Sequence, residues 1–345
     1  MIGYFVLIKR LEFGWDSIEP LRNSCEEKVS VVVAFRNESD TIQNLCDQLL
    51  NQNVLDNQLE IIMVDDHSDD DSFQKLESIQ GIILLRSDGQ GKKAAIEKGI
   101  KAASGAIILT TDGDCVIKPD WVSTMLSPFK DSSIKMVVGP VVLTNSLNTF
   151  FGHLQIMEFA SLIGSGAGAI AINRAFMCNG ANLAFRKNNF LSTKMDIASG
   201  DDVFLLHEIK RNKGIICFLK NRSAIVSTSA KQNISSFVNQ RLRWSAKSTS
   251  YTDIDAIAIS LLVFGANLSI LLSVFLLEFR LALVLVVIKF FADFSFIKKL
   301  AQFFDIKNWS LYFLSLQLVY PFYIVYIAIV SQFKNYSWKG RILKK

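Results

Sequence analysis

The first half of the chain alternates between short apolar runs and segments whose apolar residues recur at helical spacing. The run from Val29 to Phe35 is mostly β-branched, as is typical of a parallel strand covered on both faces. After it, Ile42, Leu45 and Leu49 share one face of a predicted helix. The same pattern predicts further strands within 59–71, 81–87 and 105–114 and further helices within 71–80 and 91–103. Because strands and helices alternate, we expect right-handed crossovers and a mostly parallel sheet of the α/β class.

Charged side chains follow three of these strands, at the point where each apolar run ends. Arg36 and Glu38 come after the first strand, and the acids 65–66 and 112–114 come after two later ones. In a parallel sheet the carboxyl ends of the strands meet at one edge, where ligands bind. Carboxylates gathered at one edge repel each other unless a cation is present for some of the time. Mg²⁺ or Mn²⁺ suits them, since these ions use few protein carboxylates and complete their shell with water and substrate phosphates.

Two other interpretations of these motifs were weighed. Each acidic motif alone fits a solvated turn, but their joint occurrence at strand ends favours a diphosphate site. A phosphate-binding P-loop is excluded, because Lys92 is followed by Lys93 where Ser or Thr is needed and Arg86 stands where glycine is required.

The last third of the chain contains long apolar stretches. Ala256 to Leu277 and Trp309 to Val330 are each long enough to cross a bilayer. The stretch from Leu281 to Ile297 is interrupted by Lys289 and Asp293, which are four residues apart and therefore share one helical face. A charge pair at that depth is expected to face protein or a cavity. The alternative is an interfacial helix that never crosses.

Charge is distributed unevenly along the chain. From residue 256 onward there are ten basic and three acidic side chains, a local net charge of +7, whereas the whole chain carries +5. The earlier part is thus slightly acidic, which argues against a nucleic-acid binder. The basic residues flank apolar segments, and this indicates contact with anionic lipid headgroups.

Cysteine and histidine usage points away from disulfides and zinc. The five cysteines are scattered without a CxxC pair, which favours a reducing compartment. The histidines show no paired metal spacing and are interpreted as structural: His67, His153 and His207. About eight residues precede Lys9 and Arg10, too few for a span or a signal peptide, although they fit the remnant of a longer anchor.

The order of the motifs resembles the family-two glycosyltransferases, GT-A-fold enzymes that include cellulose, chitin and hyaluronan synthases and ceramide glucosyltransferase. The resemblance is carried by VSVVVAFRNE, IIMVDDHSDD, GKKAAIEKGI, TTDGDCVIKPDW, CNGANLAFRK, SGDDVFL and QRLRW, in the family's order within residues 29–244. It implies a Rossmann-like GT-A domain followed by a C-terminal helical membrane region. Two positions depart from the usual pattern: Glu97 stands where Asn is common, and Asp201 stands where Glu is common.

The resemblance implies contacts with the sugar donor. Asp66 would contact the uracil and Asp114 the metal, with Asp112 near the ribose or the metal. The remaining residues expected around the nucleotide are Ala34, Arg36, Glu38 and Lys92.

The resemblance also implies the acceptor side. Sugar transfer needs a base for the acceptor hydroxyl, and we assign it to Asp202, with Asp201 beside it. Simple capping of the helix that these acids begin is the alternative. Residues expected near the sugar, acceptor and diphosphate are Gly180, Asn182, Gln240, Arg243 and Trp244. The QxxRW segment also fits an amphipathic helix that lies on the membrane.

We therefore expect an N-terminal stub (1–24), a catalytic domain (25–252), two to three transmembrane helices (253–333) and a basic tail (334–345). The predicted protein is an inverting, metal-dependent glycosyltransferase in the cytoplasmic membrane. Its catalytic domain would face the cytoplasm and transfer sugar from a nucleotide-diphospho-sugar, such as a UDP-sugar, to a lipid or glycan acceptor.

Two questions stay open at this level. The alternatives in function are a processive polysaccharide synthase and a catalytically inert nucleotide-sugar binding protein; few candidate spans favour single or short transfer over a channel. In topology, three crossings would leave the basic tail outside and two would leave it inside. The resemblance favours three, whereas the positive-inside tendency favours two.

Overall fold

The computed structural model describes the whole chain except residues 20–24, 56, 191–200, 334–335, 339–340 and 344–345. The chain forms two compact units. The first, here called the sheet unit, consists of Ile18–Val142 and Met177–Ser229. The second, here called the helical unit, consists of Met1–Ser17, Leu143–Phe176 and Ala230–Lys345.

These units divide the chain at other places than the boundaries expected from sequence. The N-terminal segment, residues 143–176 and the QxxRW segment all belong with the apolar C-terminal helices. The division differs because residues 143–176 contain an apolar helix that the sequence analysis did not predict. This helix interrupts the segments of mixed polarity on either side of it.

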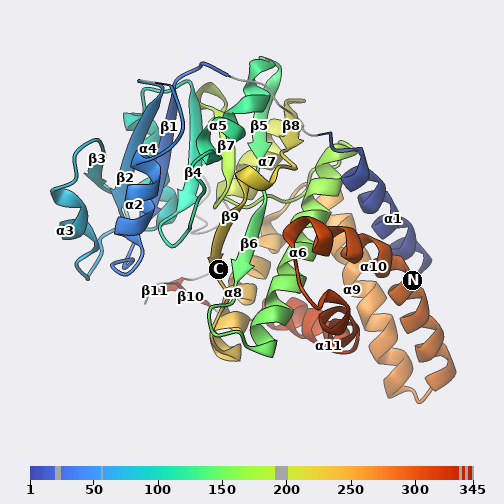
Figure 1. Ribbon diagram of the computed structural model, residues 1–345. Coiled ribbons are helices and arrows are strands. Elements are labelled where there is room, and N and C mark those ends of the chain that lie inside the picture. Colours follow the sequence, from blue (N-terminus) through green and yellow to red (C-terminus); the bar gives the residue numbers. More distant parts are fainter. Residues whose placement is uncertain (20–24, 56, 191–200, 334–335, 339–340, 344–345) are drawn as a thin grey trace. The chain divides into compact units, whose positions relative to one another are not determined.

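The sheet unit is built on a seven-stranded sheet with the order β3-β2-β1-β4-β7-β5-β8, which Figure 1 shows from left to right. The strands are parallel except for β7, which is antiparallel to both neighbours. Their bounds are β1 Val29–Phe35, β2 Leu59–Asp65, β3 Ile83–Arg86, β4 Ile107–Asp112, β5 Ile134–Val138, β7 Leu183–Arg186 and β8 Ile215–Phe218. The expected mostly parallel α/β sheet is confirmed.

Strand β1 lies at the centre of the parallel part, and every one of its residues is buried. Its last residues pair with both neighbours in register: Ala34 lies between Val64 and Asp112, and Phe35 lies opposite Asp65. The carboxyl ends of β1, β2 and β4 therefore meet at one edge of the sheet, as the sequence pattern predicts.

Helices cover the sheet and connect its strands. They are α2 Ile42–Leu50, α3 Ser72–Glu77, α4 Lys92–Ala102, α5 Trp121–Leu126 and α7 Asp201–Arg211, with short 3-10 turns at Ser127–Lys130, Lys187–Asn189 and Arg222–Ala224. Strands β6 Val141–Thr144 and β9 Val226–Ser229 form a separate two-stranded sheet. Helix α4 packs closely on β1, since a Cβ on Gly99 would come within 2.4 Å of Val32 Cγ1.

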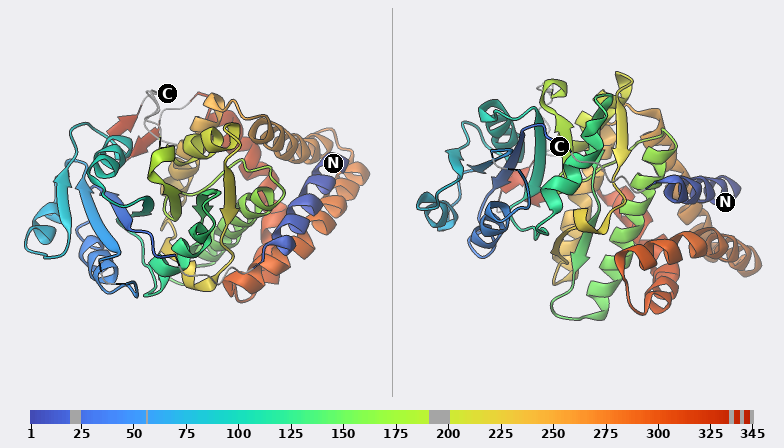
Figure 2. Two further views of the ribbon diagram at one scale, coloured as in Figure 1. Left: turned by 90° about the horizontal axis from the view of Figure 1, so that it is seen from above. Right: turned by 45° about the horizontal axis from the view of Figure 1, so that its top comes forward.

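The helical unit contains six helices and a hairpin among its described residues. They are α1 Ile2–Ser17, α6 Phe150–Ala171, α8 Ile234–Ala246, α9 Ile254–Phe275, α10 Phe279–Phe304 and α11 Trp309–Val330, followed by β10 Tyr336–Trp338 and β11 Arg341–Leu343; a 3-10 turn spans Lys247–Ser250. Figure 2 shows α1 in blue beside α10 in orange, and the two helices are packed together.

Helices α1 and α6 cross with their backbones in contact. A Cβ on Gly14 would lie 2.1 Å from the carbonyl oxygen of Gly168, and a Cβ on Gly168 would lie 2.1 Å from that of Leu11. Such small-residue crossings are typical of helices that pack within membranes. The glycines that permit this contact also lower the hydropathy of α6, which is why the sequence analysis did not predict it as a candidate span.

Within the part of the chain that the structure describes, three helices are long and apolar enough to cross a bilayer by length and composition: α6, α9 and α11. The last two match the expected spans. Helix α10 is continuous through the interrupted stretch, and its Lys289 Nζ lies 2.6 Å from Asp293 Oδ2, with both side chains buried. Tyr4 and Gln317 also hydrogen-bond to Asp293. The prediction that this charge pair faces protein is confirmed.

Candidate active site

Lys92 and Asp112 meet at the carboxyl edge of the sheet. Lys92 begins helix α4 and donates to Asp112 Oδ1 at the end of β4. Both side chains are partly exposed, at 29% and 34%. The structure thus joins two residues that are 20 positions apart and that were both expected near the nucleotide. It leaves a cation and an anion accessible at the position where a diphosphate ligand was predicted.

The glycine between the two acids of the DxD motif is explained by crowding. A Cβ on Gly113 would lie 3.0 Å from Phe35 Cβ and 3.2 Å from Glu38 Cγ. The motif therefore packs directly against the segment that follows β1, which brings Glu38 next to the motif. Beyond the glycine, Asp114 Oδ2 accepts a hydrogen bond of 3.1 Å from Thr228 Oγ1 on β9.

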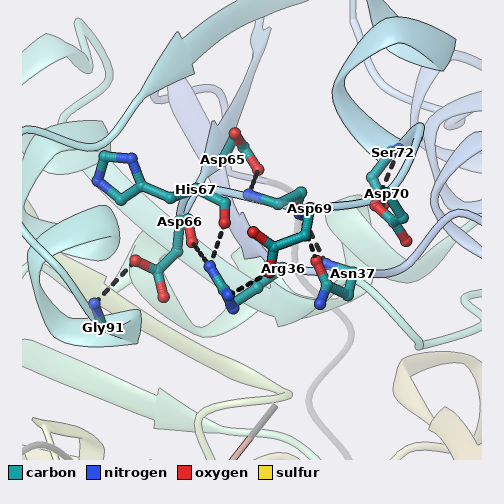
Figure 3. Close-up of polar contacts among 10 residues, drawn as sticks. Arg36, Asn37, Asp65, Asp66, His67, Asp69, Asp70, Ser72 and Gly91 are labelled. Carbon is teal, nitrogen blue, oxygen red and sulfur yellow. Dashed lines mark hydrogen bonds and ion pairs between the residues drawn. The ribbon is translucent and has the colours of Figure 1, made fainter. Parts of the chain in front are cut away.

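Asp66 connects the second strand to helix α4. Its carboxylate is buried and accepts a hydrogen bond of 2.8 Å from the backbone N–H of Gly91 (Figure 3). Gly91 has a φ of 97°, a conformation that favours glycine. Arg36 secures the same loop, because its guanidinium donates to the carbonyl oxygens of Asp66 and His67 and to the carboxylate of Asp69. Among the described residues, its buried Nε has no hydrogen-bond partner.

Other acids of this loop hold its shape. Asp65 Oδ1 accepts from the backbone N–H of Ser68 at 3.0 Å, and Asp70 accepts from Ser72 and from the N–H of Ser39. Burial opposes ionisation of Asp70, but the hydrogen bonds from Ser72 and Ser39 outweigh it and lower its pKa. The acidic run is therefore partly structural, as its alternative interpretation held, while Asp66 reaches a different element.

Asp202, the predicted base, is fixed by backbone donors. It is the second residue of α7, and its Oδ2 accepts from the N–H of Gly180 at 2.9 Å while its Oδ1 accepts from the N–H of Val203 at 2.8 Å. Gly180 is held in turn by Thr110 of β4, whose hydroxyl donates to its carbonyl oxygen at 2.9 Å. The segments CNGANLAFRK and SGDDVFL are thus linked to β4, the strand that ends at Asp112. The side chain of Asp201 lies outside the described residues.

Asn182 has a structural environment. Its side chain is fully buried, its amide nitrogen donates to the carbonyl oxygens of Pro140 and Ala224, and its amide oxygen accepts from Trp121 Nε1. Asn182 therefore joins three segments of the sheet unit. Contact with a substrate would require these bonds to change.

The QxxRW residues lie on α8 in the helical unit. Gln240 Oε1 accepts a hydrogen bond of 2.7 Å from Arg241, and the ring of Trp244 lies 5.9 Å from that of Phe159 on α6. Arg243 is in the last turn of the same helix. The sequence-predicted residues therefore fall into two groups. The residues expected around the sugar donor, here called the donor group, lie in the sheet unit together with Asp202. Gln240, Arg243 and Trp244 lie in the helical unit.

The donor group fits a cation that is bound together with a ligand. Within the described residues no three His, Cys, Asp or Glu side chains converge as a metal site. Burial and the carboxylates of Asp112 and Asp114 raise the pKa of the Cys115 thiol well above its ordinary value, which keeps the thiol protonated at neutral pH. One or two carboxylates with substrate oxygens are a typical Mg²⁺ or Mn²⁺ environment.

Sequence reasoning missed several residues that organise the site. Thr110, Thr228 and Gly91 each hold a predicted residue in place, as described above. A signal existed for Gly91, because it is the first residue of the GKKAAIEKGI motif and directly precedes α4. The two threonines gave none, because their partners come from segments distant in sequence.

Residues 30–192 match the family model described as Glycosyl transferase family 2. The chain carries a glycosyl transferase family 2 domain. The match ends before α7, so Asp202 and the QxxRW segment lie outside it. The expected family of this glycosyltransferase domain is confirmed.

Curated relatives of the glycosyltransferase domain include two poly-β-1,6-N-acetyl-D-glucosamine synthases. The protein from Staphylococcus epidermidis strain RP62A is 27% identical over 258 residues, which is 70% of this chain and 59% of the relative. The protein from Staphylococcus aureus strain MSSA476 is 27% identical over 166 residues, 47% of this chain and 40% of the relative. The chain thus matches less than two thirds of either relative's length.

Among solved structures, a mannosyltransferase from Pyrobaculum calidifontis, in complex with GDP-Man and Mn²⁺, resembles the chain with a TM-score of 0.60. The two share 15% identity, and the alignment covers 96% of this chain and 95% of that one. At this identity the likeness is one of fold, and it extends over both units.

Proposed function

We propose that the protein transfers a sugar from a nucleotide-diphospho-sugar, preferably a UDP-sugar, to a lipid or glycan acceptor at the cytoplasmic membrane. The observation that carries the proposal is the carboxyl edge of the sheet, where the Lys92–Asp112 pair, Asp114 and the loop-anchored Asp202 all belong to one unit. A family 2 domain gives this edge its chemical context.

On the donor side, charge compensation is the main requirement. Lys92 is the accessible cation that would face the diphosphate, and Asp66 with the unpartnered Nε of Arg36 would face the base. Asp114, with Asp112, would hold Mg²⁺ or Mn²⁺, which offsets the charge that develops on the departing diphosphate. The related fold that binds GDP-Man with Mn²⁺ supports such a pairing of nucleotide and metal.

On the acceptor side, Asp202 would take the proton from the attacking hydroxyl. Both carboxylate oxygens accept backbone hydrogen bonds, so its position is set before substrate binds. Attack from the side opposite the diphosphate inverts the configuration of the sugar. Trp244 would form an apolar wall for the acceptor, and Arg243 would pair with the diphosphate.

A screen of donors tests the proposal. The full chain in detergent with membrane lipid extract is offered UDP-, GDP- and dTDP-sugars, with and without Mn²⁺. We expect metal-dependent transfer with a UDP-sugar. Metal-dependent UDP binding with no hydrolysis or transfer of any donor would favour the inert binding protein instead.

A processive polysaccharide synthase is the second candidate, and the names of the two curated relatives favour it. The two candidates differ in product length. Single or short transfer predicts products of one or a few sugars even at high donor concentration, whereas a processive enzyme yields long chains while most acceptor is still unused.

The helical unit supports an even number of membrane crossings. Ser331, which follows α11, hydrogen-bonds to Ser245 of α8 at 2.9 Å, and β10 also packs against α8. The end of α11 therefore lies on the side from which α9 begins. Helices α9 and α10 are joined by a short turn and pack as a hairpin (Figure 1).

We therefore propose that an even number of helices crosses, so that the end of α11 and the basic tail lie on the cytoplasmic side, where α9 begins. This replaces the expectation of three crossings and agrees with the positive-inside tendency. Alkaline phosphatase fused after Lys345 should be inactive, whereas the same reporter inserted after Leu277 should be active. The reverse pattern would contradict the topology.

A further inference from the structure

Helix α6 carries two buried polar side chains in an otherwise apolar environment. Gln155 and Glu158 are 2% and 3% exposed and lie three residues apart, on one face of the helix. Burying an amide and a carboxylate is costly unless both are hydrogen-bonded, so their partners indicate what they are for. All of the partners described below belong to the helical unit.

Gln155 hydrogen-bonds to the backbone just before α8, the helix that carries the QxxRW motif. Its Nε2 donates to the carbonyl oxygen of Lys231 at 2.8 Å, and its Oε1 accepts from the N–H of the same residue at 2.9 Å. Two residues later Asn233 caps α8 by accepting from the N–H of Ser236. The start of α8 is therefore fixed to α6.

Glu158 binds helix α8 directly, through Arg241. Its Oε2 lies 2.5 Å from Arg241 Nη2, and its Oε1 accepts from Arg241 Nε at 3.3 Å. Tyr323 of α11 donates to the same Oε1 at 3.2 Å. Arg241 is 3% exposed, so this is a buried, bidentate charge pair with one extra donor.

Arg241 touches the two predicted acceptor residues that flank it. Its Nη1 donates to Gln240 Oε1 at 2.7 Å, and its guanidinium carbon lies 4.3 Å from the centre of the Trp244 ring. The ring of Phe237 lies on it at 4.5 Å. The orientation of the Gln240 amide and of the Trp244 indole therefore depends on where Arg241 is held.

We propose that Glu158, acting through Arg241, is a positioning residue that sets the Gln240 amide and the Trp244 ring for the acceptor. The inference rests on the proposed function and adds residues from α6 and α11 to it. Removing Glu158 leaves the Arg241 charge buried and uncompensated, so the guanidinium should move and take with it the side chains that it contacts. Among the described residues, the hydrogen-bond partners given for Glu158 lie in the helical unit, so donor binding should depend on this cluster much less than acceptor binding does.

The kinetic test uses the full chain in detergent and compares Glu158→Gln, Glu158→Asp and the double variant Glu158→Gln/Arg241→Gln. For Glu158→Gln we expect an acceptor KM raised on the order of 10-fold, with metal-dependent UDP affinity within about twofold of wild type. Glu158→Asp should recover part of the loss, whereas the double variant should recover stability but not the acceptor KM, because Gln240 and Trp244 then lack the Arg241 side chain that they contact. Arg174→Gln, which removes a surface ion pair with Asp255 in the same unit, should leave both constants unchanged. A lowered melting temperature with an unchanged acceptor KM would overturn the proposal.

A readout that needs no activity separates this inference from the proposed function. The five tryptophans, labelled with 5-fluorotryptophan, give separate ¹⁹F signals, and Trp244→Phe identifies that of Trp244. Glu158→Gln should shift the Trp244 signal, and Arg174→Gln should not. Tyr323→Phe keeps the ring and removes one bond to Glu158, so a smaller shift is expected if Glu158→Gln fails to fold. An unmoved Trp244 signal in the folded variants would refute the positioning role, whether or not wild type transfers sugar.

Discussion

Charged side chains at the sheet edge and in the helical unit differ in exposure and in partners. At the edge, Lys92 and Asp112 are about one third exposed, and Asp202 is bonded to backbone N–H groups. In the helical unit, Glu158 forms an ion pair with Arg241, and Lys289 forms one with Asp293. All four side chains are almost fully buried.

This difference separates residues that receive a ligand from residues that hold helices. A partly exposed charge at a strand end keeps its capacity to bind a substrate or a cation. In a buried pair the two charges already compensate each other, and removing either one leaves the other uncompensated. Substitutions in the two regions should therefore fail in different ways.

The largest effect is expected from breaking a buried pair. Lys289→Met leaves the Asp293 carboxylate buried without its cation, which should lower the free energy of unfolding by about 3 to 5 kcal/mol. Thermal unfolding in detergent measures this, with Lys298→Met as the control, because Lys298 is exposed on the same helix. If Lys289→Met/Asp293→Leu were no more stable than the single variant, the pair would not behave as a buried ion pair.

A comparable loss, but of activity, is expected at the sheet edge. Asp202→Asn keeps the size of the side chain and cannot accept a proton at neutral pH, so transfer should fall by roughly 10²-fold or more with UDP affinity preserved. Initial rates at saturating donor measure it. Glu208→Gln, on the same helix and paired with the exposed Arg211, should transfer normally. Near-normal transfer by Asp202→Asn would remove the base from the mechanism.

A smaller effect is expected at the base-binding loop. Asp66→Ala should weaken UDP binding roughly 10-fold while lowering turnover at saturating donor much less, because a hydrogen bond to a carboxylate is lost. Asp66→Asn retains an oxygen that can accept from the N–H of Gly91 but removes the negative charge. Comparing it with Asp66→Ala therefore separates the effect of this hydrogen bond on UDP binding from the effect of the charge. Asp71→Asn is the control, because its side chain is 61% exposed and pairs with Lys75 of α3. Unchanged affinity by calorimetry would count against the assignment.

The smallest effect concerns pH and stability. Because the pKa of Asp70 is lowered in the folded state, its contribution to stability is present above its unfolded value of 3.8 and is lost as the pH falls through the folded pKa. Asp70→Asn should lower stability by less than about 1 kcal/mol at pH 7, since the group is largely solvated. The difference from wild type should shrink below pH 4. A constant difference across that range would show that the carboxylate charge is not responsible.

The sheet edge was predictable because parallel topology alone collects strand ends. Ala34, Asp66 and Asp112 needed only the alternating pattern and the order of the strands to be placed together. The supporting contacts of Thr110 and Thr228 were not predictable, because each depends on a partner more than 60 residues away.

The helical unit was harder to predict for a physical reason. Helix α6 owes its packing to Gly164 and Gly168, whose lack of side chains lets other helices approach and also lowers its apolar signal. Glu158, an isolated acid in an apolar helix, was the available sign that a buried partner existed. Its partner Arg241 stands at a variable position of the QxxRW motif and was not among the predicted site residues.

The central claim is that the sheet edge binds a nucleotide diphosphate together with a divalent cation. Titration calorimetry of UDP with and without Mn²⁺, on wild type, Asp114→Asn and Asp202→Asn, tests it most directly. Mn²⁺ alone should bind weakly, since no three ligating side chains converge in the described residues, and it should strengthen UDP binding to wild type and to Asp202→Asn. Asp114→Asn should lose that strengthening. Equal strengthening in Asp114→Asn, or its loss in Asp202→Asn alone, would contradict the account.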